Sequence, residues 1–121
     1  MNKTVFNEYC ASLPATSHVV QWGGVTVWKV GGKMFACFSM GPKADPQEKI
    51  SFKCSDIAFE VLCEQEAFIP APYLARGKWV QCNANGGVDD DTLKNYISDA
   101  HAIIAAKLSK KAQKELGLLN L

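Results

Sequence analysis

The two histidines are the first residues to test for chemistry, because an imidazole can act as a base or a metal ligand near neutral pH. His18 precedes a β-rich run, and His101 lies beside the apolar face of a helical pattern. The sequence contains no G-x-S-x-G, G-x-x-x-x-G-K-[ST] or H-E-x-x-H motif, which would indicate a nucleophile, a phosphate loop or a zinc pair. We therefore expect both histidines to be structural or surface residues and the protein to have no catalytic residue.

Carboxylates recur at short spacing in two places. Glu64 and Glu66 are two residues apart in a helical pattern, so their side chains point away from each other. Asp89, Asp90 and Asp91 precede a long helical pattern, where aspartate caps a helix and interacts favourably with its dipole. No further ligands follow at the spacing of a calcium loop. We expect no metal site, no cofactor and no enzymatic activity.

Five cysteines, an odd number, are distributed through apolar runs without a C-x-x-C pair. They are Cys10, Cys37, Cys54, Cys63 and Cys82. This usage is typical of reduced thiols that pack as small hydrophobic side chains. No apolar stretch approaches the roughly 20 residues of a membrane span, and Met1 leads into an amphipathic run instead of a secretion signal. We expect a cytoplasmic protein without a membrane partner.

Cations alternate with aromatic residues in two segments, a combination that suits phosphates and bases. The stretch VWKVGGKMFACFSM at 27–40 has a lysine on each side of a Gly-Gly pair, and the second segment covers residues 73–79. The second segment equally suits an ordinary turn with a buried tryptophan. Because the formal net charge is only +1, a nucleic-acid site must be a local patch. The candidate contacts are Lys29, Lys33, Lys53, Arg76, Lys78 and Trp79.

A two-residue turn at Gly31-Gly32 would place Lys29 and Lys33 on opposite faces of a β-hairpin, because side chains alternate along a strand. One face would carry Lys29, Val27, Met34, Ala36 and Phe38, and the other Lys33, Trp28, Val30, Phe35 and Cys37. This geometry permits a wing tip inserted between phosphates. The face with Trp28 and Phe35 is either partly exposed for binding or closed by a cross-strand aromatic pair.

Hydrophobic periodicity and turn residues predict the elements that position these side chains. Helices are expected at 4–13 with Thr4 as N-cap, at 56–66 with Ile57, Ala58, Val61 and Leu62 buried, and from Asp89–Asp91 onward to a stop at Gly117. Strands are expected at 18–22, 25–30, 33–39, 50–54 and 78–82, with an edge segment or loop at 68–73. Lys107, Lys110, Lys111 and Lys114 would lie near the C-terminus of the last helix, where its dipole favours positive charge. These elements predict a two-layer α+β domain over residues 1–121, with an antiparallel sheet and N-terminal, middle and C-terminal helices.

Several segments, in the same order, resemble the MmcQ/YjbR family of small bacterial proteins. They are YCASLP at 9–14, VWKVGGKMFACFSM at 27–40, ISFKCSD at 50–56, PAPYLARGKWV at 70–80 and LKNYISDAHAIIAAKLSKK at 93–111. The resemblance covers nearly the whole chain. It implies a fold shared with secretion chaperones, in the order helix, three strands, helix, two strands, helix. It also implies DNA binding through a double wing of hairpins. Relatives commonly have a histidine where this chain has Lys78.

Two functions from different classes remain open. The protein is either a DNA-binding domain that uses the hairpin tip and the 73–79 turn, or an interaction module that binds a protein or peptide on a sheet face or edge. In either case we expect a monomer.

Overall fold

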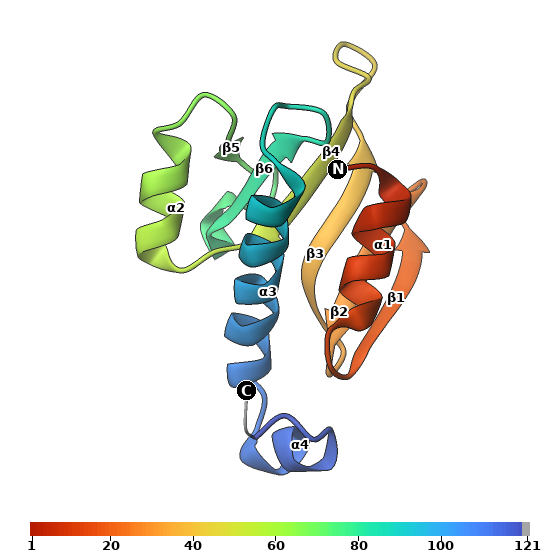
Figure 1. Ribbon diagram of the computed structural model, residues 1–121, viewed down its shortest axis with the longest axis vertical. Coiled ribbons are helices and arrows are strands. Elements are labelled where there is room, and N and C mark those ends of the chain that lie inside the picture. Colours follow the sequence, from red (N-terminus) through yellow and green to blue (C-terminus); the bar gives the residue numbers. More distant parts are fainter. Residues whose placement is uncertain (120–121) are drawn as a thin grey trace.

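An antiparallel sheet of six strands, in the order β1-β2-β3-β4-β6-β5, organises the fold in the computed structural model, which describes residues 1–119 (Figure 1). The elements are α1 (Lys3–Ser12), β1 (Thr16–Gln21), β2 (Val25–Val30), β3 (Lys33–Met40), β4 (Glu48–Lys53), α2 (Asp56–Cys63), β5 (Ile69–Pro70), the 3-10 turn η1 (Ala75–Gly77), β6 (Trp79–Asn83), α3 (Asp90–Ala106) and α4 (Lys110–Glu115). The α+β architecture is confirmed. Four strands precede α2, however, one more than the resemblance implies. The last two residues of the predicted 1–121 domain lie outside the described range.

Polar side chains begin the helices. Asn2 Oδ1 accepts a hydrogen bond from the backbone of Val5 at 2.8 Å, so Asn2 is the N-cap of α1 and the expectation for Thr4 was wrong. Ser55 caps α2 in the same way, and Asp89 caps α3 through the backbone of Thr92. The aspartate expected to cap the long helix is therefore the first of the three.

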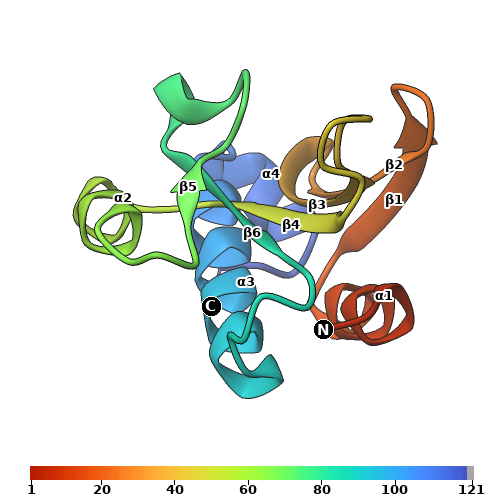
Figure 2. The ribbon, with the colours of Figure 1, turned by 90° about the horizontal axis from the view of Figure 1, so that it is seen from above.

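One face of the sheet is covered by α1 and α3, and the main core lies between these layers (Figure 2). Its fully buried large side chains include Phe6 from α1, Phe52 from β4, and Leu93 and Ile97 from α3. The opposite face carries a smaller cluster that contains Val27, Cys37, Ala71 and Trp79. The sheet therefore has a helix-covered face and an open face.

A β-bulge changes which side chains of the β2–β3 hairpin share a face. Lys29 pairs with Met34, but Trp28 pairs with Ala36, so Phe35 is an extra residue in β3. Beyond this bulge the alternation shifts by one residue. Ala36 and Phe38 consequently pack in the main core and Cys37 on the open face, the reverse of the expected assignment.

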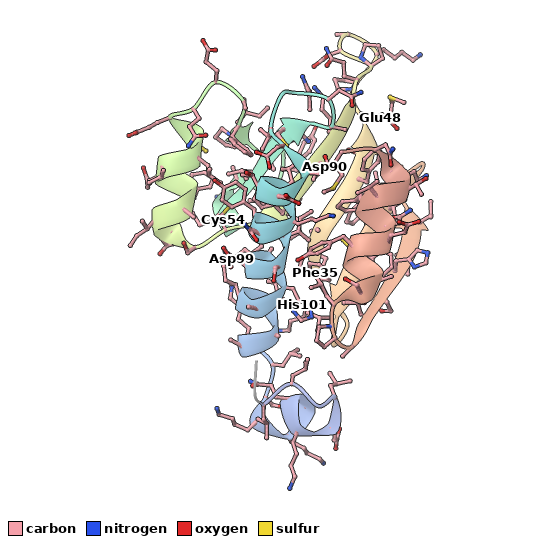
Figure 3. All side chains as sticks on the ribbon, viewed as in Figure 1. Phe35, Glu48, Cys54, Asp90, Asp99 and His101 are labelled. Carbon is pink, nitrogen blue, oxygen red and sulfur yellow. The ribbon has the colours of Figure 1, made fainter. Side chains whose placement is uncertain are left out.

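Trp28 and Phe35 both lie in the helix-covered core, so the exposed aromatic face expected from the sequence does not form. Nor do they form the alternative aromatic pair. Trp28 stacks on His18 with ring centroids 4.6 Å apart, and its Nε1 donates to Asn7. Phe35 meets the ring of His101 edge-on at 5.3 Å, between β3 and α3 (Figure 3).

Helix α2 packs at the β5–β6 edge of the sheet and turns only a narrow side to the core (Figure 1). Leu62 is buried, and Ala58 and Phe59 are half-buried. Ile57 and Val61, expected on the buried stripe, are exposed. The apolar stripe of this short helix is wider than the surface it contacts.

Candidate nucleic-acid interface

The C-terminal ends of β2, β4 and α3 lie toward the end of the molecule that holds α4 (Figure 1). Strands β2 and β4 run in the same direction because each is antiparallel to β3. Helix α3 runs toward the same end, since Leu108 just beyond it contacts the β2–β3 turn. Segments far apart in the sequence therefore bring their terminal cations toward one end of the fold.

Lys29 and Lys33 point to opposite faces of the hairpin, as the sequence predicts. Val30 pairs with Lys33, so Lys33 shares the helix-covered face with this buried valine and is itself exposed. Lys29 pairs with Met34, whose side chain packs in the open-face cluster, and Lys29 is half-buried. Of the two lysines, Lys33 is therefore the more accessible to a ligand.

The hairpin tip is docked against the helical layer and is not a free wing. Gly31 has a φ of +57°, and a Cβ atom at this position would lie 2.5 Å from Leu108 Cδ1. Gly32, at φ +81°, has open space around the same position. The tip therefore fits closely against the segment between α3 and α4, which fixes Lys33 relative to that segment.

Lys53 is unsuited to phosphate contact, because its ammonium group already has a protein partner. Its side chain is buried, and Nζ donates to the carbonyl oxygen of Gly77. Burial lowers the pKa of Lys53, and repulsion from Lys107 lowers it further. Sequence reasoning did not anticipate this burial. Lys53 lines the same pocket as Ala102 and Ile103, so the end of β4 and the C-terminal half of α3 lie close together.

The 73–79 segment contributes one freely exposed cation. Arg76 is exposed in η1, whereas Lys78 is half-buried with Nζ 4.9 Å from the centre of the Phe59 ring. Trp79 is buried in the open-face cluster, so its ring cannot stack on a base. The interpretation of this segment as a turn with a buried tryptophan is confirmed for Trp79.

Sequence reasoning did not count the lysines after residue 106 among the candidate DNA contacts, because it placed them all at the end of one helix, where the helix dipole already favours positive charge. The chain instead breaks at Lys107–Ser109, and Ser109 caps a separate helix, α4, through the backbone of Ala112 at 3.1 Å. Lys110 and Lys111 therefore occupy the first turn of α4, where a helix dipole disfavours positive charge. Ser109 before a polar helical run was the signal that could have revealed this break.

His101 and Cys37, two side chains with the chemistry of a base and a nucleophile, are both buried. His101 is buried, and its Nε2 lies 2.8 Å from the carbonyl oxygen of Pro14. Burial raises the pKa of the Cys37 thiol to about 12, so this thiol is not a nucleophile at neutral pH. No three side chains of His, Cys, Asp or Glu in the described residues gather as a metal site would require. None of the described helices is sufficiently long and apolar for a membrane crossing.

Comparison with known proteins identifies the family of the chain and solved structures with the same fold. The family model described as YjbR matches residues 11–103. The chain belongs to the YjbR family. Among solved structures, the Deinococcus radiodurans protein DR2400, a DUF419 protein, is 23% identical, with a TM-score of 0.81 over 93% of this chain and 86% of that one. A Pseudomonas syringae protein is 18% identical, with a TM-score of 0.72 over 86% of this chain and 99% of its own. At these identities the two likenesses concern the YjbR fold alone. No curated protein matches the sequence.

Proposed function

We propose that the protein is a non-enzymatic DNA-binding domain whose contact surface is the basic end. This surface is defined by Lys33, Lys107, Lys110, Lys111 and Lys114, with Arg76 as a flanking cation. The observation that carries the proposal is the docking of the hairpin tip on Leu108, because it joins Lys33 to the lysines of α4. Phosphates attract such a cluster regardless of base sequence.

The lysines of the basic end form no ion pair with a carboxylate of residues 1–119. In the described part of the chain, the ion pairs join the Met1 ammonium group to Asp90 and Lys49 to Asp45. The lysines of the basic end are exposed and have no such partner among residues 1–119. An anion bound there would relieve the repulsion between neighbouring ammonium groups, especially at the first turn of α4.

The experiment is a titration of a fluorescently labelled DNA duplex at several salt concentrations. A contact with three or four phosphates gives a log–log slope of about −3, because each phosphate contributes about −0.9. We expect measurable binding at low salt and this steep weakening as salt rises. A slope near zero would contradict contact through phosphates.

The decisive variant is Lys110→Glu combined with Lys111→Glu. Glutamate in the first turn of α4 interacts favourably with the helix dipole, so this variant should keep the helix folded. DNA affinity should fall at least about tenfold at low salt, which corresponds to about 1.4 kcal/mol. The matched control is Lys3→Glu with Lys43→Glu, which makes the same change in net charge at exposed positions outside the basic end.

Two outcomes would count against the proposal. Equal DNA affinity of the α4 variant and the control would mean that the basic end is not the contact surface. Absence of DNA binding by the parent protein at low salt would leave the alternative of an interaction module that binds a protein or peptide partner.

A further inference from the structure

The open face of the sheet contains a cleft of about 590 Å³ that the proposed function does not use. Its walls come from the β1–β2 turn, the β3–β4 loop and the segment between β5 and η1. Figure 2 shows the β3–β4 loop and the η1 segment projecting from the side of the sheet opposite α1 and α3. The volume lies within the range of about 300–1,000 Å³ that is typical of small-molecule sites.

The floor of the cleft combines apolar side chains with hydrogen-bonding groups. Cys37, Ser51 and Gln81 are neighbours in one cross-strand row, and Ser39 lies in the next row beside Lys49. Gln81 Nε2 donates to Ser51 Oγ at 3.2 Å, which orients the amide and leaves its carbonyl oxygen as an acceptor. The hydroxyl groups of Ser39 and Ser51 can donate. The floor therefore offers a donor and an acceptor side by side.

Two aromatic residues stand at the rim of the cleft in unfavourable backbone conformations. Trp22 is 64% exposed with a φ of 52°, and Tyr73 is fully exposed with a φ of 68°. A left-handed conformation costs a residue with a Cβ atom about 1 kcal/mol. Neither ring recovers this cost by burial in the fold. Residues held in such conformations cluster at ligand-binding sites in proteins.

Among the described residues, no unpaired charge lines the cleft. Lys49 is the charged residue in its lining, and Nζ lies 2.6 Å from Asp45 Oδ2 while also donating to Asn83. The nearby Cys37 thiol is neutral because burial raises its pKa. An anionic or cationic ligand would have to compete with the Lys49–Asp45 pair. An uncharged ligand avoids this competition.

A peptide strand fits this face poorly. The strands that form the floor, β3, β4 and β6, are each paired on both sides, so they have no free backbone edge for an added strand. The available interactions are stacking on the rim and side-chain hydrogen bonds on the floor. These interactions suit a flat ring with polar atoms on its edge.

We propose that the cleft binds an uncharged, planar heteroaromatic molecule of about nucleoside size. The ring packs against Trp22 and Tyr73, and its polar edge meets Ser39 and the carbonyl oxygen of Gln81. This proposal is independent of DNA binding at the basic end.

The test is a titration of isotope-labelled protein with adenosine, followed by the backbone amide signals in NMR, at salt high enough to suppress contacts with phosphates. We expect saturable shifts at Ser39, Ser51 and Gln81 at millimolar adenosine. AMP should bind no more tightly than adenosine. The absence of saturable shifts at these residues, or a tenfold preference for AMP, would overturn the assignment.

The variants Trp22→Gly and Tyr73→Gly remove the rings and also relieve the positive φ angles, so both should fold. Each should weaken adenosine binding at least about tenfold. Ala15→Gly is the matched control, because Ala15 has a φ of 58° and lies outside the lining of the cleft. Unchanged adenosine binding in both Trp22→Gly and Tyr73→Gly would refute the packing of the ligand against these two rings.

Discussion

Burial keeps four thiols of the core, those of Cys10, Cys37, Cys54 and Cys82, protonated at pH values at which an exposed cysteine ionises. It raises the pKa of Cys37 from 9.0 to about 12, and those of Cys54 and Cys82 to about 11. The folded state therefore binds these protons more tightly than the unfolded chain. The stabilisation is fully present below pH 9 and is lost as the pH rises toward the folded-state values.

We predict that the free energy of unfolding decreases steeply between pH 9 and 11, as measured by urea denaturation. The slope for each thiol approaches about 1.4 kcal/mol per pH unit. Lys53 acts in the opposite direction, because its lowered pKa makes the charged form costly below 10.5, but four thiols outweigh one amine. Cys37→Ala should reduce this dependence, and replacing the half-buried Cys63, whose pKa burial also raises, by serine should reduce it less. A stability that is constant over this range would contradict the prediction.

His101 illustrates what sequence can and cannot reveal about a single residue. Its position beside the apolar face of a long helix was visible from periodicity. Its contact with the carbonyl oxygen of Pro14 was not, because that partner lies 87 residues away in the chain. Likewise, the sequence shows that residue 53 is a lysine and therefore a cation. Only the fold shows that its ammonium group donates a hydrogen bond to the carbonyl oxygen of Gly77.

The elements themselves were largely predictable, and the errors have local physical causes. Gly-Gly turns and β-branched runs located the hairpins, and the helix expected at 56–66 begins, as α2, at Asp56. The bulge at Phe35 has no sequence signal of its own, because the alternation on each side of it is regular. The break before α4 did have a signal in Ser109, which the lysine-rich helical pattern concealed.

The docking of the β2–β3 hairpin on the α3–α4 segment can be tested with two neighbouring glycines. Gly31→Ala and Gly32→Ala both impose a left-handed conformation, which costs about 1 kcal/mol. Only Gly31→Ala also places a Cβ atom against Leu108, and this overpacking should cost about 1–3 kcal/mol more. Thermal or urea unfolding measures the difference. Leu108→Ala should remove the excess cost of Gly31→Ala, and equal costs for the two glycines would argue against a docked tip.

Exposed lysines gather at one end of the molecule even though the net charge is close to zero. The basic end contains α4, while Glu48, Asp90 and the other two aspartates at the start of α3 lie toward the far end (Figure 3). Helix α3 connects these ends with its N-terminus among carboxylates and its C-terminus at Lys107, so side-chain charges complement its dipole. Net charge alone therefore underestimates how strongly one surface attracts anions.

We predict that the protein is retained on a sulfonate cation exchanger at neutral pH and low salt, despite its net charge of +1. The variant with glutamate at positions 110 and 111 should elute earlier than the variant with glutamate at positions 3 and 43. The two variants have the same net charge, so the difference reports where the charge lies. Identical elution would show that the basic end does not dominate the electrostatic surface.

Because the cysteines differ in burial, the rate at which each one reacts with a thiol reagent measures how often the structure around it opens. Cys63 is half-buried, whereas Cys10, Cys37, Cys54 and Cys82 are shielded on both faces of the sheet and at its end. A thiol reagent should modify Cys63 directly but must wait for an opening event before it reaches each of the others. Mass spectrometry of timed reactions would then separate partial openings, which expose one thiol, from complete unfolding, which exposes all of them at one rate.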